Sequence, residues 1–305
     1  MTGMLAFDGR GRFGSREHFF HYMWGFLLPA LHRLTSTGAA GGAAAMSCGP
    51  VMDAVTAEAF GLLGLEVEIR DEPPGEGAIL LPRWDAALRR NCPYFTPAPS
   101  AAARLRRALG AAAYALRDPG FAPRPGELAL IRRRIAAFAP TLLRAAEASV
   151  GDASRFDGRI LLLKRAAMRN YYAEGGGAAN KGYGAGRRSL LGVDEAAEAL
   201  RAAGMPAVVF VPGEADFATQ IVAFNRAAGL VAIRGAELAN MVWMRRGARA
   251  LVFAPRRMME ENPPIPTLVA QMAAVRYREV ARDDGAHFAL DPADAIPYFK
   301  VAPAA

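Results

Sequence analysis

The chain has 305 residues, of which 52% are hydrophobic and 22% charged, a globular composition that excludes a disordered chain and allows two domains. Its net charge of +8 comes from arginines spread along the whole sequence, so we expect anionic partners such as nucleotide phosphates, acidic glycans or an anionic membrane surface. No helix-turn-helix, zinc-finger or RNA-recognition pattern is visible, so nucleic acid is not an expected partner.

The first half of the chain is predicted to be α/β, with elements of uneven length. The longest apolar run, at 19–31, is too short to span a bilayer, and no secretory signal precedes it. Two cysteines without metal-type spacing favour a reducing, cytosolic compartment.

The predicted elements of the first half are a helix at 17–33, an Ala/Gly-rich stretch at 38–45, a helix at 51–63, strands at 65–69 and 78–81, and helices at 100–115 and 126–139.

From residue 159 onward, apolar strand-like runs alternate with segments of helical period. This alternation predicts a doubly wound parallel sheet. Asp194 and Asp216 stand where helix N-caps belong, and Gly204 and Gly229 where helices should stop. The expected strands are 160–164, 207–211, 230–233, 250–254 and 277–281, and the expected helices are 193–203, 216–228, 237–244 and 266–275.

Connectors at 118–125 and 150–155 place the predicted domain boundary near residue 150. We therefore expect an α/β domain at 1–150 and a Rossmann-like domain at 151–305, with the cleft between them as the default ligand site. A glycine-rich loop at 170–188 has the length of a lid or a disordered segment. Its G-x-G-x-G string lies too far from the preceding strand for a dinucleotide fingerprint.

The most informative stretch is GLVAIRGAELANMVWMRRGARALVFAP, at 229–255. It predicts a strand, a turn of small residues at Gly235 and Ala236, a short helix at 237–244 and a second strand. A helix N-terminus presents unpaired N–H groups and a positive dipole end, so this turn could bind a phosphate. An ordinary strand-to-helix connection would have the same appearance.

Several segments, in order, resemble glycosyltransferase family 61, and the likeness covers most of the chain. HFFHYMWGFLLPALHRL (18–34) is similar to the family's early segment, in which an aromatic–His pair precedes a helix. MDAVTAEAFGLLGLE (52–66), ILLLKR (160–165) and RRSLLGVDEAAEAL (187–200) follow in family order. The most specific part is EADFATQIVAFNRAAGLVAIRGAELANMVWM (214–244), which resembles the Phe-x-x-Gln helix and the His-Gly-Ala-x-Leu-x-Asn element.

The resemblance implies a GT-B architecture of two Rossmann-like domains. It also implies an inverting, metal-independent enzyme without a cofactor, which moves a sugar from a nucleotide-sugar donor to a glycan or lipid-linked glycan acceptor in bacterial surface polysaccharide synthesis. Residues 1–150 would form the acceptor side and 151–305 the donor side. The expected localisation is cytoplasmic, with a peripheral contact to the inner face of the membrane allowed by the basic charge.

Two departures from the family pattern concern the turn itself. Arg234 stands where the family usually has His, and Glu237 where Gly commonly follows the Ala. An imidazole role is lost at that site, whereas an arginine can still hold a diphosphate through paired hydrogen bonds and a permanent charge.

Inverting transfer needs charge stabilisation for the leaving diphosphate and a base for the acceptor hydroxyl. We expect His21 to be the base, with His18 on the same helical face, although a lone His in an apolar helix is more often structural. Asp53 and Glu58 are alternatives. The expected donor-site residues are Arg165, Arg188, Arg234, Gly235, Ala236, Glu237, Gln220 and Asn240.

Two other functions stay open at this stage. A non-catalytic relative could bind nucleotide or glycan as a partner subunit, which the loss of the family's His favours. A different Rossmann-type enzyme using NAD or S-adenosylmethionine lacks the expected glycine fingerprint next to a strand.

Overall fold

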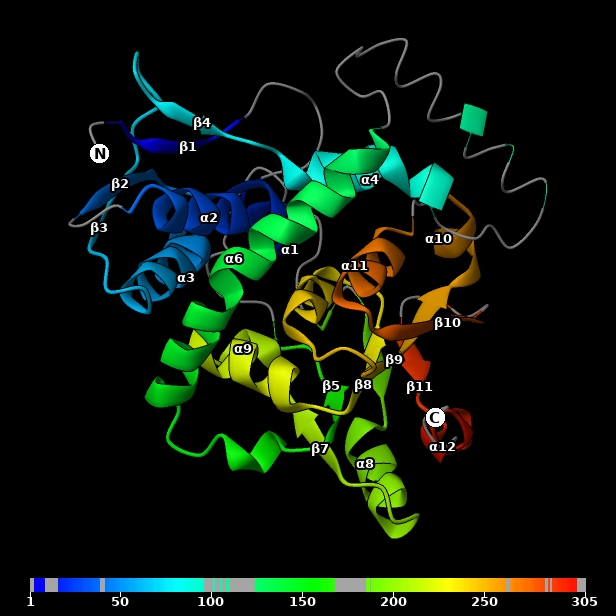
Figure 1. The fold of residues 1–305 in the computed structure, drawn as a ribbon. Helices are drawn as coiled ribbons and strands as arrows, with labels where there is room; N and C mark the ends of the chain where they lie inside the picture. The colour runs from blue at the N-terminus through cyan, green and yellow to red at the C-terminus, as the bar shows by residue number, and fades with distance from the viewer. Residues whose placement is uncertain are drawn as a thin grey trace. The chain divides into compact units, whose positions relative to one another are not determined.

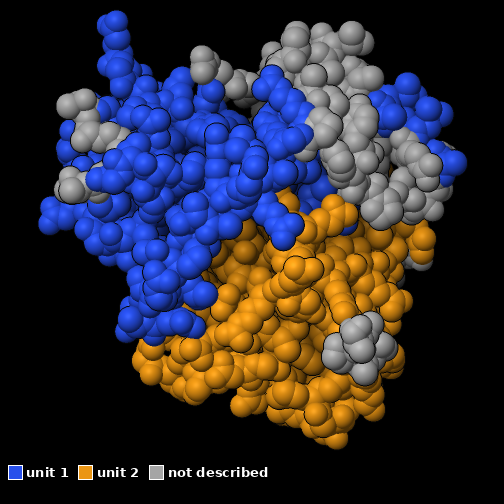
Figure 2. Space-filling model, in the orientation of Figure 1, with its two compact units in different colours: residues 1–149, 177–179, 263–268 blue, residues 150–176, 180–262, 269–305 orange. Residues whose placement is uncertain are grey.

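In a computed structural model the chain forms two compact units, which Figure 2 shows in different colours. Unit 1 comprises residues 1–149, 177–179 and 263–268, and unit 2 comprises residues 150–176, 180–262 and 269–305. The expected helix at 100–115 and the glycine-rich loop at 170–188 lie largely outside the described residues. The structure describes residues 3–8, 16–38, 42–95, 101, 105, 108–109, 124–167, 185–186, 188–261, 264–282, 285 and 287–300.

Unit 1 contains a parallel sheet of four strands in the order β3-β2-β1-β4 (Figure 1). Its strands are β1 (Leu5–Phe7), β2 (Ala43–Met46), β3 (Val67–Arg70) and β4 (Ile79–Leu81). Its helices are α1 (Phe19–Tyr22), the π-helix η1 (Met23–Leu27), α2 (Leu28–Ser36), α3 (Pro50–Gly61), α4 (Trp84–Phe95) and α6 (Pro125–Ser149).

The helix predicted at 17–33 is confirmed, but it contains a π-helical segment that the sequence pattern does not reveal. The segment η1 ends two residues before Pro29, which has no N–H to donate into the helix. Such a residue breaks the regular hydrogen-bond ladder, and π-bulges are one way in which a helix accommodates the break.

The helix α6 is longer than predicted, because it continues through Pro140. An internal proline costs a helix about 3 kcal/mol, and the helix predicted at 126–139 ends just before this one. The helix persists because one apolar stripe is buried on both sides of the proline. The stripe consists of Ile131, Ile135, Phe138, Leu142 and Ala146.

Unit 2 contains a parallel sheet of five strands in the order β10-β9-β8-β5-β7 and a second, two-stranded sheet. The strands are β5 (Ile160–Leu163), β6 (Ser189–Leu191), β7 (Ala207–Phe210), β8 (Gly229–Ile233), β9 (Arg249–Pro255), β10 (Arg276–Arg282) and β11 (His287–Ala289). The helices are η3 (Ser154–Phe156), α8 (Val193–Ala202), η4 (Pro212–Glu214), α9 (Phe217–Arg226), η5 (Ala236–Trp243), α10 (Arg256–Glu261), α12 (Pro292–Lys300) and α11 (Ile265–Ala273), which falls partly in each unit.

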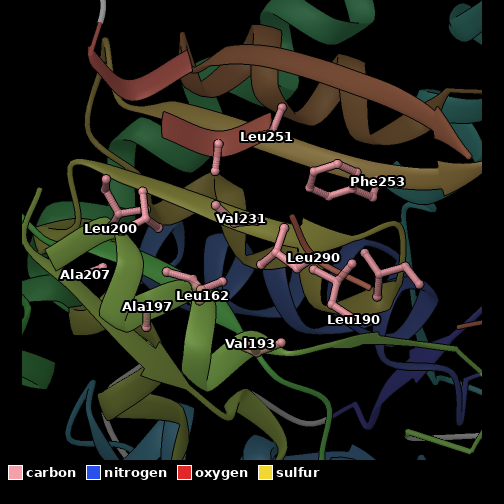
Figure 3. Close-up of a cluster of buried hydrophobic side chains, with 14 of the residues drawn as sticks. Leu162, Leu190, Val193, Ala197, Leu200, Ala207, Val231, Leu251, Phe253 and Leu290 are labelled. Atoms are coloured by element: carbon pink, nitrogen blue, oxygen red, sulfur yellow. The ribbon is translucent and has the colours of Figure 1, made fainter. Parts of the chain in front are cut away.

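A buried hydrophobic cluster joins the sheet of unit 2 to α8 (Figure 3). Strands buried on both faces read as continuous apolar runs, which is why β5 and β8 were recognisable from sequence. Every residue of both strands is buried. The members labelled in Figure 3 are Leu162, Leu190, Val193, Ala197, Leu200, Ala207, Val231, Leu251, Phe253 and Leu290.

The predicted α/β class with parallel sheets is confirmed. The helix caps and helix ends predicted in the second half are confirmed in part. The Asp216 side chain accepts a hydrogen bond from Thr219 N at 2.6 Å and caps α9. Asp194 is not an N-cap, because Gly192 takes that position. Gly229 does not end a helix but begins β8. The helix expected at 237–244 is the 3₁₀-helix η5, not an α-helix.

Candidate active site at the carboxyl ends of two parallel sheets

In each of the two larger sheets, strands that follow in the sequence are added first on one side of the first strand and then on the other. The place where the side changes is the topological switch point of the sheet. In unit 1 it lies between β1 and β4, and in unit 2 between β5 and β8. Open α/β sheets bind ligands outside the carboxyl ends of the strands at such a switch point. Both places carry charged side chains that are largely buried, and these residues form the candidate sites.

In unit 2, Arg165 follows β5 by two residues and points across the switch point. Its Nη2 donates to Glu237 Oε2 at 2.8 Å, and its Nη1 approaches the Arg188 carbonyl at 3.4 Å. The side chain is only 8% exposed, and its Nε is buried without a hydrogen-bond partner among the described residues. A buried donor left unsatisfied costs about 1–3 kcal/mol, so Arg165 is suited to an added acceptor.

The turn that sequence analysis identified as an anion site adjoins Arg165. Gly235 is the N-cap of η5 and has an extended backbone. The space next to its Cα is filled by the Arg165 guanidinium and the Glu237 carboxylate rather than left open. Gly235 therefore makes room for an arginine of the site, and Ala236 begins η5 beside it.

The other two predicted arginines meet at Met258 of α10. Arg188 Nη1 contacts Met258 Sδ, and Arg234 Nη1 lies 3.4 Å from the Met258 carbonyl oxygen. Arg234 also pairs with Glu279 of β10 at 3.4 Å, and both side chains are largely buried. The structure thus brings Arg165, Arg188 and Arg234 to one edge of the sheet, through contacts that the sequence did not indicate.

Glu279 lies close to Tyr277 of the same strand, whose hydroxyl oxygen is buried. Burial raises the pKa of Tyr277 well above its ordinary value, and the nearby Glu279 carboxylate adds to the effect, while Arg234 opposes it. The phenol therefore stays neutral.

Gln220 and Asn240 pair with each other beneath the turn. Asn240 Nδ2 donates to Gln220 Oε1 at 2.9 Å, and Gln220 Nε2 donates to the Ala215 carbonyl at 3.1 Å. Asn240 is fully buried and Gln220 nearly so. This pair joins α9 to η5 and so fixes the helix that carries Glu237.

In unit 1, His21 lies on α1 and contacts a residue that the sequence analysis did not select. Its Nδ1 is 2.9 Å from Asp85 Oδ2 at the start of α4. Arg83 donates to both oxygens of Asp85, from Nε at 2.8 Å and from Nη2 at 2.6 Å. Asp85 is completely buried, whereas the His21 side chain is 16% exposed.

Asp53, the other predicted catalytic residue, lies in the first turn of α3 and bonds to the loop before it. Its carboxylate accepts from Ser47 Oγ and from Cys48 N, each at 2.7 Å. Burial raises the pKa of the Cys48 thiol, and the Asp53 carboxylate adds to the shift, so the thiol stays protonated. These contacts give Asp53 a role in holding the turn between β2 and α3.

Sequence reasoning missed Arg83, Asp85 and Glu279. For the first two a signal existed, because they directly follow the strand predicted at 78–81, and polar residues at strand ends gather at one sheet edge. For Glu279 the signal was a charged residue inside the strand predicted at 277–281.

Comparisons with known proteins complete the description. A model of the family described as Glycosyltransferase 61 matches residues 19–251. No curated protein matches the chain. In the described part of the chain, no helix is long and apolar enough to cross a bilayer, and no cluster of three or more His, Cys, Asp or Glu side chains could hold a metal ion.

Proposed function

The chain belongs to glycosyltransferase family 61, and we propose that it is an inverting, metal-independent enzyme that transfers a sugar from a nucleotide-sugar donor to a glycan acceptor. The observation that carries the proposal is the meeting of Arg165, Arg188 and Arg234 at the β5–β8 switch point. These arginines outnumber the carboxylates of Glu237 and Glu279, so this group of five keeps a positive charge.

In this reaction the acceptor oxygen attacks the anomeric carbon, and the bond from that carbon to the diphosphate oxygen breaks. The leaving diphosphate takes the electron pair, and its growing negative charge must be stabilised. Arg165 is the best-placed residue, because its guanidinium is largely desolvated and its Nε has no hydrogen-bond partner in the described part of the chain. The acceptor hydroxyl loses its proton to a base, for which we propose His21.

The strand orders support a GT-B architecture with two Rossmann-like domains. Numbered in chain order within each sheet, the four-stranded sheet of unit 1 reads 3-2-1-4 and the five-stranded sheet of unit 2 reads 5-4-3-1-2. Both are orders of doubly wound nucleotide-binding sheets. We propose unit 2 as the donor side and unit 1 as the acceptor side of a cytoplasmic enzyme of surface polysaccharide synthesis. Its acceptor would be a glycan or lipid-linked glycan, and its basic charge favours peripheral contact with an anionic membrane.

Donor binding is tested by calorimetry of the full-length protein with uridine, guanosine, cytidine and adenosine diphosphates. We expect one of them to bind, and Arg165→Ala to weaken its binding by at least about 10-fold. Arg246→Ala is the matched control, because Arg246 is an exposed arginine of the same unit. An equal loss of affinity in both variants would mean that only the overall charge of the protein matters. No binding to any diphosphate would overturn the proposed donor site.

Turnover is tested next, with the matching sugar nucleotides and an acceptor panel. The anomeric configuration of the product, read by NMR, tests inversion. Activity after treatment with a chelator tests metal independence, and restoration by added divalent ions would contradict it.

A second candidate function is a non-catalytic relative that binds nucleotide or glycan as a partner subunit. Arg234 and Glu237 are the two positions that depart from the family pattern, and each forms an ion pair in the structure. Arg234 pairs with Glu279, and Glu237 pairs with Arg165, which favours this function. Diphosphate binding without turnover across all donors and acceptors would favour this function over transfer.

A further inference from the structure

The polar cluster of unit 1 is built around a single carboxylate, that of Asp85. Besides its two bonds to Asp85, Arg83 donates from Nη1 to the Asp8 carbonyl at 2.8 Å, and its guanidinium lies 4.0 Å from the centre of the Phe7 ring. Both of these residues stand at the carboxyl end of β1. The cluster therefore lies at the switch point of unit 1, where sheets of this kind bind ligands.

Asp85 is ionised despite its complete burial. Burial by itself would raise the pKa of its carboxyl, but hydrogen bonds from Arg83 and His21, together with the charges of these two residues, lower it below the ordinary value. The paired Arg83 brings a positive charge next to the Asp85 carboxylate.

The absence of a side chain at Gly25 lets the helix approach the cluster closely. Gly25 lies in the π-helix η1, and a Cβ there would come within 2.9 Å of both Arg83 Nε and Asp85 Oδ1. The helix that carries His21 thus packs directly on the Arg83–Asp85 pair. This packing leaves no room for a side chain at residue 25, and it brings the helix close to the carboxylate that His21 contacts.

We propose that Asp85, held by Arg83, is a positioning residue that keeps His21 in the tautomer with the proton on Nδ1. The Nε2 lone pair is then the atom that takes the proton of the acceptor hydroxyl while the acceptor oxygen bonds to the anomeric carbon. This inference rests on the proposed transferase function. It adds to that function a residue pair, Arg83 and Asp85, that sequence reasoning did not select.

Among the described residues, the groups around His21 include side chains of α1 and α4 and one residue that precedes α4. Asp85 of α4 and Arg83, just before it, are the charged residues in direct or relayed contact. His18, the N-cap of α1, has its ring centre 5.1 Å from that of His21. The Phe20 ring meets the His21 ring edge-on. A test must therefore separate the contribution of His18 from that of Asp85.

The tautomer can be measured without activity, by ¹⁵N NMR of the full-length protein labelled at histidine. The chain has four histidines, so the loss of signals in His21→Gln assigns those of His21, and His18→Gln assigns its neighbour. At a pH where the imidazole is neutral, we expect a protonated Nδ1 and an unprotonated Nε2 at His21. The opposite tautomer in the wild-type protein would overturn the proposal, and this readout requires no Asp85 variant to fold.

Kinetics test the positioning role. Asp85→Asn keeps the shape of the side chain but replaces one acceptor oxygen with an NH2 donor, which would face a donor of Arg83 or His21. The hydrogen bond that holds the tautomer of His21 is then weakened or lost, so we expect kcat to fall about 10²–10⁴-fold. The affinity for the nucleoside diphosphate should stay within about 2-fold, since that site lies on other residues. Asp71→Asn is the matched control, because Asp71 is an exposed carboxylate of the same unit.

The outcomes separate this inference from the proposed function. If the wild type transfers sugar, His21→Gln does not, and Asp85→Asn keeps both the wild-type kcat and the wild-type tautomer, the role of Asp85 is overturned while the function stands. A fully active His21→Gln overturns the base assignment and again leaves the function. Absence of transfer by the wild type overturns the function and the base together.

Discussion

The guanidinium of Arg165 packs directly on the backbone of Gly235, with Cζ 2.9 Å from where a Cβ atom at residue 235 would stand. The glycine is required here by space and not by conformation, since its backbone is extended. This contact fixes the position of the cation at the proposed donor site.

Gly235→Ala should displace the Arg165 side chain, because its terminal nitrogen and a new Cβ cannot occupy the same place. We expect a loss of nucleoside diphosphate affinity similar to that of Arg165→Ala, with a loss of stability of about 1–3 kcal/mol. Calorimetry and denaturant unfolding measure the two effects. Gly151→Ala is the control, because a Cβ at residue 151 meets open space; wild-type affinity in Gly235→Ala would remove Arg165 from the site.

Glu237→Gln should strengthen diphosphate binding. The Glu237 carboxylate takes a hydrogen bond from Arg165 that a phosphate oxygen would need, and it repels an incoming anion. We expect about 10-fold tighter binding, which corresponds to about 1.4 kcal/mol. Glu198→Gln, an exposed residue of α8, controls for overall charge. Weaker binding instead would show that Glu237 bonds to the ligand, for example to a ribose hydroxyl.

Arg234 should prove necessary for stability. It forms a largely buried ion pair with Glu279, and removing one partner of such a pair costs about 3–5 kcal/mol. Arg234→Met should therefore unfold at lower denaturant concentration, and Arg234→Met/Glu279→Leu should recover much of the loss. A double variant that is no more stable than Arg234→Met would contradict this account.

Asp216→Ala should destabilise unit 2 by about 0.5–2 kcal/mol, because the side chain caps α9 through Thr219 N. Asp194→Ala should lower the thermal midpoint much less, since Asp194, in the first turn of α8, is not a helix cap and its side chain pairs with the exposed Lys164. Differential scanning fluorimetry compares the two. Equal effects would mean that the capping contact contributes nothing particular.

The stability of unit 1 should depend on pH through Asp85. Because the pKa of this carboxyl is lower in the folded protein than its ordinary value of about 3.9, its contribution is present above about pH 4 and disappears as the pH falls through the folded pKa. Urea unfolding of wild type and Asp85→Asn at several pH values tests this. The difference in unfolding free energy should shrink below about pH 4, and a constant difference would refute the linkage.

The elements that the sequence revealed are those with strong local patterns. The strands β5 and β8 are continuous apolar runs, and Asp216 marks the start of α9. The strand β2, with the sequence AAAM, was not recognisable, because alanine has no preference for strands. It is a strand because it pairs with β1 on one side and β3 on the other.

In the candidate site, too, some residues were recognisable from the sequence and others only from the structure. His21, Arg165 and the turn at Gly235 were identified because they lie in segments that resemble the family or stand at strand ends. The Asp85 partner of His21 is 64 residues away in the chain, and the Glu237 partner of Arg165 is 72 residues away. No local pattern connects residues at such separations.

The sequence by itself indicated the α/β class, the family and the arginines that we propose for diphosphate binding, because composition, period and motif are local properties of the chain. Only the tertiary structure decided that these arginines face Glu237 and Glu279, and that Asp85 and Arg83 hold His21. The physical reason is that the strand order sets which strand ends become neighbours, and that order depends on packing across the whole sheet.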